Sequence, residues 1–255
     1  MRRFFVPEQT LCGSEVPLFG ETLHHLGTVL RLPEGEEVLL LDGAGTVCRC
    51  RIEALAKAEG KARVLKRWQE TETAFPVHLY QALPKGERME LVLQKGTELG
   101  IRAFTPLLAG RTIPRLPAAR AEKRRQRWER IVREAARQCR RPCLPRLDAP
   151  RTMTEALPEC DQELRLMLWE QGSRPLNEVL PPAPPRSAAI LVGPEGGFGA
   201  DEAGQAREAG FLPVRIGPRI LRTETAGFAV AAILQYLYGD LGAGPGGPAP
   251  LKEAL

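Results

Sequence analysis

The alternation of strand-like and helix-like segments after residue 76 constrains the fold more than any other feature of this chain. Residues 77–83 form an apolar strand-like run, residues 86–99 repeat apolar side chains at helical spacing, and residues 101–108 return to a strand pattern. Strand patterns recur at residues 164–169 and 188–192. Strands that alternate with helices build a parallel sheet with helices on both faces. We therefore predict an α/β fold for this part of the chain.

The N-terminal segment follows a different pattern, with short strands separated by turn residues. Residues 37–42 are apolar and lead into Gly43-Ala44-Gly45, and residues 46–52 alternate between apolar and polar side chains. This arrangement predicts a hairpin within a small β-barrel-like domain. We place this domain at residues 1–72 and the α/β domain at residues 73–241, because the pattern changes near residue 73.

The C-terminal part of the chain completes the predicted α/β domain. A helix ends near residue 209, a strand follows at residues 212–216, and an apolar helix occupies residues 225–238. The last helix is hydrophobic nearly all round, so it must be covered on more than one side, either within its own domain or by another subunit. Residues 242–255 are rich in Gly and Pro, and we expect them to be disordered.

Composition narrows the class of protein. Of the 255 residues, 43% are hydrophobic, which is ample for a buried core. No apolar run approaches the roughly 18 residues of a membrane helix, so we expect a cytoplasmic protein with no membrane partner. Cys48-x-Cys50 and Cys139-x3-Cys143 are conceivable half-sites for zinc, but no second pair stands at a suitable spacing. We interpret the six cysteines as reduced thiols and expect no bound metal.

The positive charge is concentrated in one segment. The net charge is only +5, but residues 115–151 carry thirteen Arg or Lys against four Asp or Glu, which leaves −4 for the rest of the chain. Much of this segment is a predicted amphipathic helix over residues 117–138. A cationic element on a slightly acidic body is typical of a protein that binds a phosphate-rich partner. A solvated Arg-rich face is the alternative, but solubility requires less charge than this.

Two turns near the C-terminus are candidate ligand-binding segments. Residues 193–199, Gly-Pro-Glu-Gly-Gly-Phe-Gly, directly follow an apolar strand, and their glycines allow the backbone to approach a ligand closely. An ordinary turn is the alternative. Residues 221–225 precede the apolar helix, where their hydroxyls and acid can cap the helix start. Arg222 could also face a crevice shared with the first turn, because both turns follow the carboxyl ends of strands.

These motifs together resemble the family of 16S ribosomal RNA uridine-N3 methyltransferases. The resemblance runs in order from residue 2 to about residue 238. Its most specific parts are Gly-Pro-Glu-Gly-Gly-Phe at residues 193–198 and Arg-Ile-Leu-Arg-Thr-Glu-Thr-Ala at residues 219–226. The other matching segments are residues 2–6, 25–31, 94–100, 127–131 and 134–138.

The resemblance implies a PUA-like RNA-binding domain of the β-barrel type, followed by a SPOUT domain whose C-terminal segment forms a trefoil knot. It also implies that S-adenosylmethionine binds in the knot at the interface of a homodimer, and that the substrate is 16S rRNA or the small ribosomal subunit. The cofactor-binding residues carried over from the family are Glu170, Val192, Gly193, Pro194, Glu195, Gly196, Ile216, Gly217, Leu221, Arg222, Thr223, Thr225 and Ala226.

The resemblance also suggests catalytic and RNA-binding residues. Uridine N3–H is weakly acidic, and we hypothesise that Arg222 stabilises charge on the uracil oxygens while Glu224 orients Arg222 or accepts the N3 proton. The alternative is that Arg222 contacts a phosphate and Glu224 caps a helix. His25 is interpreted as a structural residue. The predicted RNA-binding residues are Arg2, Arg3, Arg31, Arg137, Arg140 and Arg141.

Two other functions are weighed against this one. A non-catalytic ribosome assembly factor would share the knotted fold and the RNA-binding surface without turnover, and the intact segments at residues 193–198 and 219–226 favour the enzyme. A nicotinamide-dependent enzyme would need its glycine motif between a strand and a helix. Gly242, Gly244 and Gly247 match that spacing, but no strand precedes them and Pro245 interrupts the run.

Overall fold

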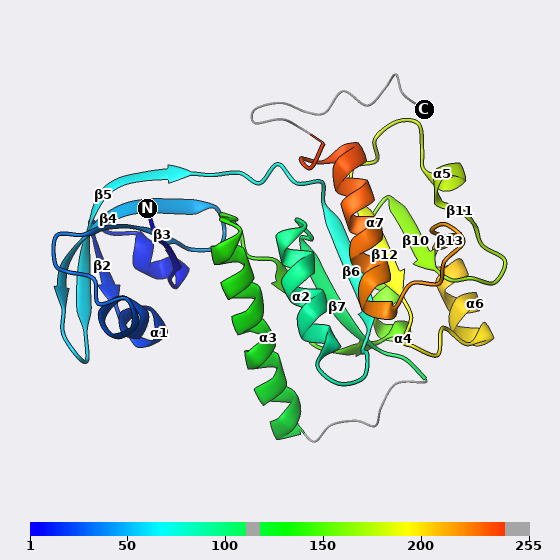
Figure 1. Ribbon diagram of the computed structural model, residues 1–255, viewed down its shortest axis with the longest axis horizontal. Helices are drawn as coiled ribbons and strands as arrows, with labels where there is room; N and C mark the ends of the chain where they lie inside the picture. The colour runs from blue at the N-terminus through cyan, green and yellow to red at the C-terminus, as the bar shows by residue number, and fades with distance from the viewer. Residues whose placement is uncertain (111–117, 243–255) are drawn as a thin grey trace. The chain divides into compact units, whose positions relative to one another are not determined.

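The computed structural model describes residues 1–110 and 118–242, so the predicted disordered tail and Arg115 lie outside the described residues, apart from residue 242. The chain divides into two compact units (Figure 1). The first unit contains residues 1–72 and 133–144. The second contains residues 73–132 and the chain from residue 145 onward.

The first unit is built on a five-stranded sheet in the order β1-β3-β4-β5-β2. Its pairs are antiparallel except β1 with β3, which is parallel. Two helical segments, α1 and the π-helical turn η2, contribute Leu23 and Leu26 to the same core as Val38, Leu40 and Ile52 of the strands. The elements are β1 (Arg3–Phe5), η1 (Glu8–Leu11), β2 (Glu15–Leu18), α1 (Gly20–His24), η2 (His25–Val29), β3 (Glu37–Leu41), β4 (Thr46–Leu55) and β5 (Gly60–Gln69).

The predicted hairpin of this unit is confirmed by the antiparallel pairing of β3 with β4. Asp42 closes the turn, because its Oδ1 accepts hydrogen bonds from the backbone N–H groups of Ala44 at 2.7 Å and Thr46 at 3.0 Å. Gly43 and Gly45 have φ angles of +79° and +105°, which side chains other than glycine rarely tolerate. The turn chemistry therefore fixes the register of the two strands.

The second unit contains an eight-stranded sheet in which every strand pair is parallel. Its order is β11-β13-β10-β12-β6-β7-β8, and β9 also pairs with β7. The predicted parallel sheet is confirmed. The strands are β6 (Val77–Ala82), β7 (Ala103–Leu108), β8 (Arg146–Leu147), β9 (Arg151–Thr152), β10 (Leu164–Leu168), β11 (Arg174–Pro175), β12 (Ala188–Val192) and β13 (Leu212–Arg215).

Helices bury both faces of this sheet, as predicted. Because side chains alternate along a strand, Leu79 of β6 packs in one core with α2 and α7, and Tyr80 packs in another with α4 and α6. The central strands β6 and β12 are buried at every position, which is why their sequences are continuously apolar or uncharged. The helical segments are α2 (Arg88–Glu98), α3 (Ala118–Gln138), α4 (Met153–Ala156), η3 (Leu157–Glu159), α5 (Leu176–Val179), α6 (Ala200–Glu208) and α7 (Thr223–Tyr238).

The apolar helix α7 is anchored to the sheet by a buried amide. The Gln235 side chain is fully buried; its Oε1 accepts from the backbone N–H of Phe75 at 2.8 Å, and its Nε2 donates to the carbonyls of Phe75 at 2.9 Å and Gly100 at 3.2 Å. The opposite side of α7 is more open, and Tyr236 is 53% exposed. The helix is therefore covered on one side by its own unit.

Two helix boundaries differ from those expected. The helix α2 begins at Arg88 rather than residue 86, because Gly86 has φ +67° and cannot join a right-handed helix. The helix α7 begins at Thr223 rather than residue 225. This earlier start places Thr223 and Glu224 within the first helical turn, and both are buried.

Candidate functional site

Four connections leave the same edge of the parallel sheet in the second unit. In the strand register, Gln81 of β6 pairs with Val192 of β12, Val192 pairs with Leu168 of β10, and Leu168 pairs with Val214 of β13. The strands therefore end at one level, and the chain segments that follow them emerge together. This edge is where open α/β sheets bind ligands.

The two predicted ligand-binding turns meet at this edge. Thr223 Oγ1, at the start of α7, donates a hydrogen bond to the carbonyl of Gly193 at 2.5 Å. Gln81 Nε2 donates to Thr223 Oγ1 at 2.9 Å and to the carbonyl of Ala82 at 3.0 Å. Thr223 and Gln81 are both buried. A buried chain of hydrogen bonds thus connects the ends of β6 and β12 to the start of α7.

The glycine turn after β12 has the geometry of a close backbone approach. A Cβ atom at Gly193 would lie 3.2 Å from the Phe198 ring, which packs in the core beneath the turn. Gly197 has φ +67° and closes the turn by donating its N–H to the carbonyl of Pro194 at 2.9 Å. Glu202 then accepts from the N–H of Gly199 at 2.8 Å at the start of α6. The turn is therefore held by its own bonds.

Arg88, which the sequence interpretation missed, links the two turns electrostatically. Its Nη1 donates to Glu195 Oε1 at 2.7 Å, and the backbone N–H of Lys85 donates to the same oxygen at 2.9 Å. These bonds and the charge of Arg88 lower the pKa of Glu195, although partial burial opposes them as the largest single effect. The Nε of Arg88 lies 3.8 Å from Glu224 Oε1 on α7.

Glu224 is a buried carboxylate with unused hydrogen-bonding capacity. It is 7% exposed, and among the described residues no group donates a hydrogen bond to its Oε2. The cation within ion-pair range is Arg88, whereas Arg222 is exposed at the N-terminal end of α7. Within the described part of the chain, no side-chain hydrogen bond caps α7. Glu224 therefore retains an acceptor for a ligand group, and burial makes an unmatched acceptor costly.

The other predicted cofactor-binding residues lie around this edge. Val192 and Pro194 are buried, and Gly196 is exposed on the glycine turn. Gly217 is exposed with φ +64°, and an added Cβ would meet nothing within 4 Å, so the turn after β13 is open to a ligand. Glu170 is exposed in the loop after β10. Those that remain are Ile216, Leu221 and Thr225, all half-buried, and Ala226, which is buried.

The predicted RNA-binding arginines all belong to the first unit. Arg2, Arg31 and Arg140 are exposed. Arg3 donates to Glu70 at 3.2 Å and to the carbonyl of Arg140 at 2.9 Å. The six predicted arginines are therefore not equivalent in exposure or in partners.

Arg137 and Arg141 carry acidic partners within the first unit. Arg137 is ion-paired with Glu134. Arg141 is only 8% exposed, and Glu72 accepts from its Nε at 2.5 Å and from its Nη2 at 2.8 Å. A buried, bidentate pair of this kind fixes the fold of the unit and leaves little of the guanidinium for a phosphate.

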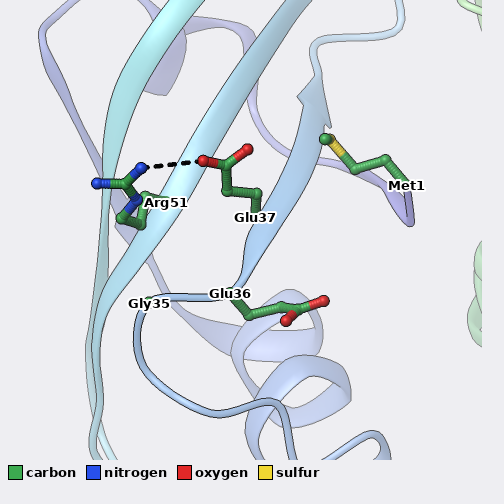
Figure 2. A pocket seen from close by; sticks show the side chains of 5 residues that line it. All are labelled: Met1, Gly35, Glu36, Glu37 and Arg51. Atoms are coloured by element: carbon green, nitrogen blue, oxygen red, sulfur yellow. Dashed lines mark hydrogen bonds and ion pairs between the residues drawn. The ribbon is translucent and has the colours of Figure 1, made fainter.

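A cavity in the first unit has the wrong charge for a phosphate. Figure 2 shows this cavity of about 680 Å³ with Glu36 and Glu37 on its wall, together with Met1 and Gly35. Arg51, on the same wall, is joined to Glu37 at 3.1 Å. In residues 1–110 and 118–242 there is no cluster of three or more His, Cys, Asp or Glu suited to a metal ion. No described helix is long and apolar enough to cross a membrane.

The parallel sheet with a glycine turn at one edge, the separate β domain and the likeness to a solved methyltransferase structure place the chain in the class of SPOUT-type methyltransferases with a PUA-like domain. Residues 71–235 match the family described as RNA methyltransferase domain, and residues 19–65 match the RNA methyltransferase PUA domain. The chain belongs to this family, that of ribosomal RNA small subunit methyltransferase E. The predicted resemblance is confirmed.

Individual relatives are similar over nearly their full lengths. The ribosomal RNA small subunit methyltransferase E of Mycobacterium bovis is 36% identical, covering 88% of this chain and 87% of its own. That of Bacillus subtilis is 32% identical, covering 92% and 96%. The crystal structure of the Neisseria gonorrhoeae enzyme, bound to S-adenosyl methionine, is 35% identical with a TM-score of 0.84, covering 94% of this chain and 99% of that one.

Proposed function

We propose that this protein transfers a methyl group from S-adenosylmethionine to N3 of a uridine in 16S rRNA of the small ribosomal subunit. The observation that carries the proposal is the hydrogen bond from Thr223 to Gly193, because it brings the two turns of the family motif into one site. The methyltransferase relatives support the reaction class. The N3 position follows from the family resemblance.

The residues at the sheet edge fit the proposed cofactor. The exposed Gly217 turn and the compact Gly193 turn offer backbone groups at close range, which suits a nucleoside held by main-chain contacts. Ile216 and Leu221 supply half-buried apolar surface beside them. When bound, the cofactor supplies an electrophilic methyl group. Glu170 and the remaining predicted cofactor-binding residues complete the proposed site.

The proposed chemistry assigns different roles to Arg222 and Glu224. Uridine N3 gains the methyl group as it loses its proton, so a nearby acceptor and a cation beside the uracil oxygens both assist. The free Oε2 of Glu224 is the proposed proton acceptor, with Arg88 beside its other oxygen. Arg222 is exposed and has no ion-pair partner among the described residues, which leaves its guanidinium available for the uracil oxygens or a phosphate.

The proposal extends to the RNA substrate and to the assembly. The target base must be unpaired or swung out, because N3 lies on the Watson–Crick edge. Exposed Arg2, Arg31 and Arg140 are the proposed phosphate contacts, and Arg141 is left out because Glu72 holds it. The side of α7 that its own unit leaves partly exposed supports a homodimer, because a second subunit could cover it. We further propose a cytoplasmic protein with a domain boundary near residue 72.

The test is incubation of unmodified small subunits with the protein and labelled S-adenosylmethionine, followed by nucleoside analysis. Label in N3-methyluridine supports the proposal, and label elsewhere or none refutes it. Glu224→Gln should lower the rate about 100-fold with little change in cofactor affinity, as expected when a general base is removed. A protein that binds the subunit and never incorporates label would instead be a non-catalytic assembly factor.

A further inference from the structure

A second cavity in the first unit combines aromatic rings with one arginine, Arg133, that has no acidic partner among the described residues. It has a volume of about 250 Å³ and lies between the end of β1, helix α1 and the last part of α3. Its wall includes Phe4, Phe19, His25, Arg133 and Arg137. None of the residues predicted to bind the cofactor lines it. The volume lies just below the roughly 300–1,000 Å³ of cavities that hold drug-sized ligands, so it suits one nucleotide-sized group.

On the aromatic part of the cavity wall, the Phe4 ring is buried and the Phe19 ring is exposed. Phe4 is 3% exposed and packs edge-on against His25, with 5.6 Å between ring centroids. Phe19 is 49% exposed. Gly20, with φ +57°, turns the chain immediately after Phe19. Phe19 therefore stands at the cavity with a face available for stacking.

The cationic part of the cavity is incompletely matched. Arg137 is ion-paired with Glu134 and lies over the Phe4 ring at 5.9 Å, but its buried Nε has no acceptor among the described residues. Arg133 is half-buried and has no hydrogen bond or ion pair with any described residue. A half-buried guanidinium without a partner costs free energy unless an anion matches it. The cavity thus offers a ligand the Phe19 ring and the guanidinium of Arg133, while Arg137 is matched by Glu134 and Glu21 also lies on the wall.

We propose that this cavity binds a single unpaired nucleotide of the RNA substrate, at a site separate from the methylated uridine. The base stacks on Phe19, and a phosphate oxygen accepts from Arg133. Proteins recognise single-stranded RNA in this manner, with bases stacked on aromatic side chains and phosphates held by cations. The inference rests on the proposed function for the nature of its ligand, and it adds a site that the catalytic edge does not contain.

The test measures binding of a fluorescein-labelled single-stranded RNA heptamer of mixed sequence to the full chain. Phe19→Ala should weaken binding about tenfold, which lies within the range expected for stacking of one base on an aromatic ring. Phe19→Tyr should restore it, and Phe19→Leu should not, since a leucine lacks a ring face. Leu65→Ala is the matched control, because Leu65 is a 40% exposed apolar residue of the same unit that does not line the cavity.

The role of Arg133 is tested through the salt dependence of RNA binding. Arg133→Gln should reduce the slope of log K against log salt by about 0.7, the value for one phosphate contact on a single strand. Phe19→Ala should leave the slope unchanged, and exposed Lys57→Gln is the matched control for lost charge. RNA containing 4-thiouridine should crosslink to the peptide that carries Phe19.

Distinct outcomes separate this inference from the proposed function. If Phe19→Ala and Arg133→Gln bind the heptamer as tightly as Leu65→Ala and Lys57→Gln, the nucleotide site does not exist, even where the wild type forms N3-methyluridine. If the wild type forms no N3-methyluridine but both variants lose binding, the site stands and the proposed reaction fails.

Discussion

The guanidinium of Arg88 lies 2.7 Å from the carboxylate of Glu195, at the point where the β6–α2 connection meets the glycine turn after β12. The same guanidinium has its Nε 3.8 Å from Glu224. One side chain therefore spans the two turns of the site. The Arg88 side chain is 43% exposed, so its ion pair with Glu195 contributes little to the free energy of unfolding. The main effect of this pair is to hold the two turns in position.

Replacing Arg88 with alanine should impair the reaction more than the fold. We expect kcat/KM to fall about tenfold, equivalent to about 1.4 kcal/mol, because Glu195 and Glu224 lose their common partner. Steady-state kinetics on small subunits and urea unfolding would measure the two effects. Arg186→Ala is the control, since Arg186 is a 93% exposed arginine paired with Glu163 in the same unit. Equal kinetics for the two variants would contradict the assigned role.

Thr223→Val should remove the hydrogen bond that joins the two turns of the site. The substitution keeps the side-chain volume and removes the donor to Gly193 and the acceptor for Gln81, both in buried surroundings. We expect the free energy of unfolding to fall by about 1–3 kcal/mol and S-adenosylmethionine to bind less tightly. Calorimetry with the cofactor and urea titration would test both. Exposed Thr73→Val, which removes only a bond to Asp240, should change neither.

Gln235→Leu should destabilise the second unit without altering the site. The leucine nearly fills the same space but leaves the backbone groups of Phe75 and the carbonyl of Gly100 without their partner. We expect a loss of about 2–4 kcal/mol, measured by urea unfolding, because buried polar groups that lose their bonds are costly. Gln126→Leu, on an exposed face of α3, is the matched control. A loss below about 1 kcal/mol would show that Gln235 is not an anchor.

Acid should destabilise the second unit through His78. Burial, and then the charge of Arg146, lower the pKa of His78 from 6.5 to about 4; the nearby Asp148 opposes this shift. The ring stacks on Tyr80 at 4.1 Å, and its Nε2 lies 2.8 Å from Thr105 Oγ1. Between pH 6.5 and about 4 the unfolded chain binds the proton and the folded chain does not, so stability falls as pH falls through this range.

The contribution of His78 is at most about 3 kcal/mol, and it is fully present above pH 6.5. Urea unfolding as a function of pH would measure it. His78→Gln should flatten the curve between pH 4 and 6.5, whereas His24→Gln, an exposed control, should not. If the wild type and His78→Gln lose stability in parallel, the assignment to His78 is wrong.

The parallel sheet and its two covered faces could be predicted from sequence because β6 and β12 are apolar or uncharged at every position. The hairpin of the first unit could be predicted because Gly43 and Gly45 mark its turn. The trefoil knot was predicted from the family resemblance alone, since periodicity carries no information on threading. The short strands β8, β9 and β11, of two residues each, were missed because they are too short to show a period.

The site was predicted only where glycines and the family motif marked it. Gln81 was missed because it lies inside a buried strand, where nothing in the sequence distinguishes a hydrogen-bonded amide from a core residue. Arg88 was missed because it is one of many arginines, and only the fold brings it within reach of Glu195 and Glu224.

The strands β6, β10, β12 and β13 end at one level of the sheet. The connections beyond this level form the proposed binding site, whereas the buried strands stabilise the fold. A connection that leaves this level can lengthen, shorten or exchange residues without shifting any strand against its neighbour. New target bases or new reactions could therefore arise by changes in these connections alone, while the buried sheet tolerates few substitutions. In such an architecture, specificity can diverge quickly on a framework that changes slowly.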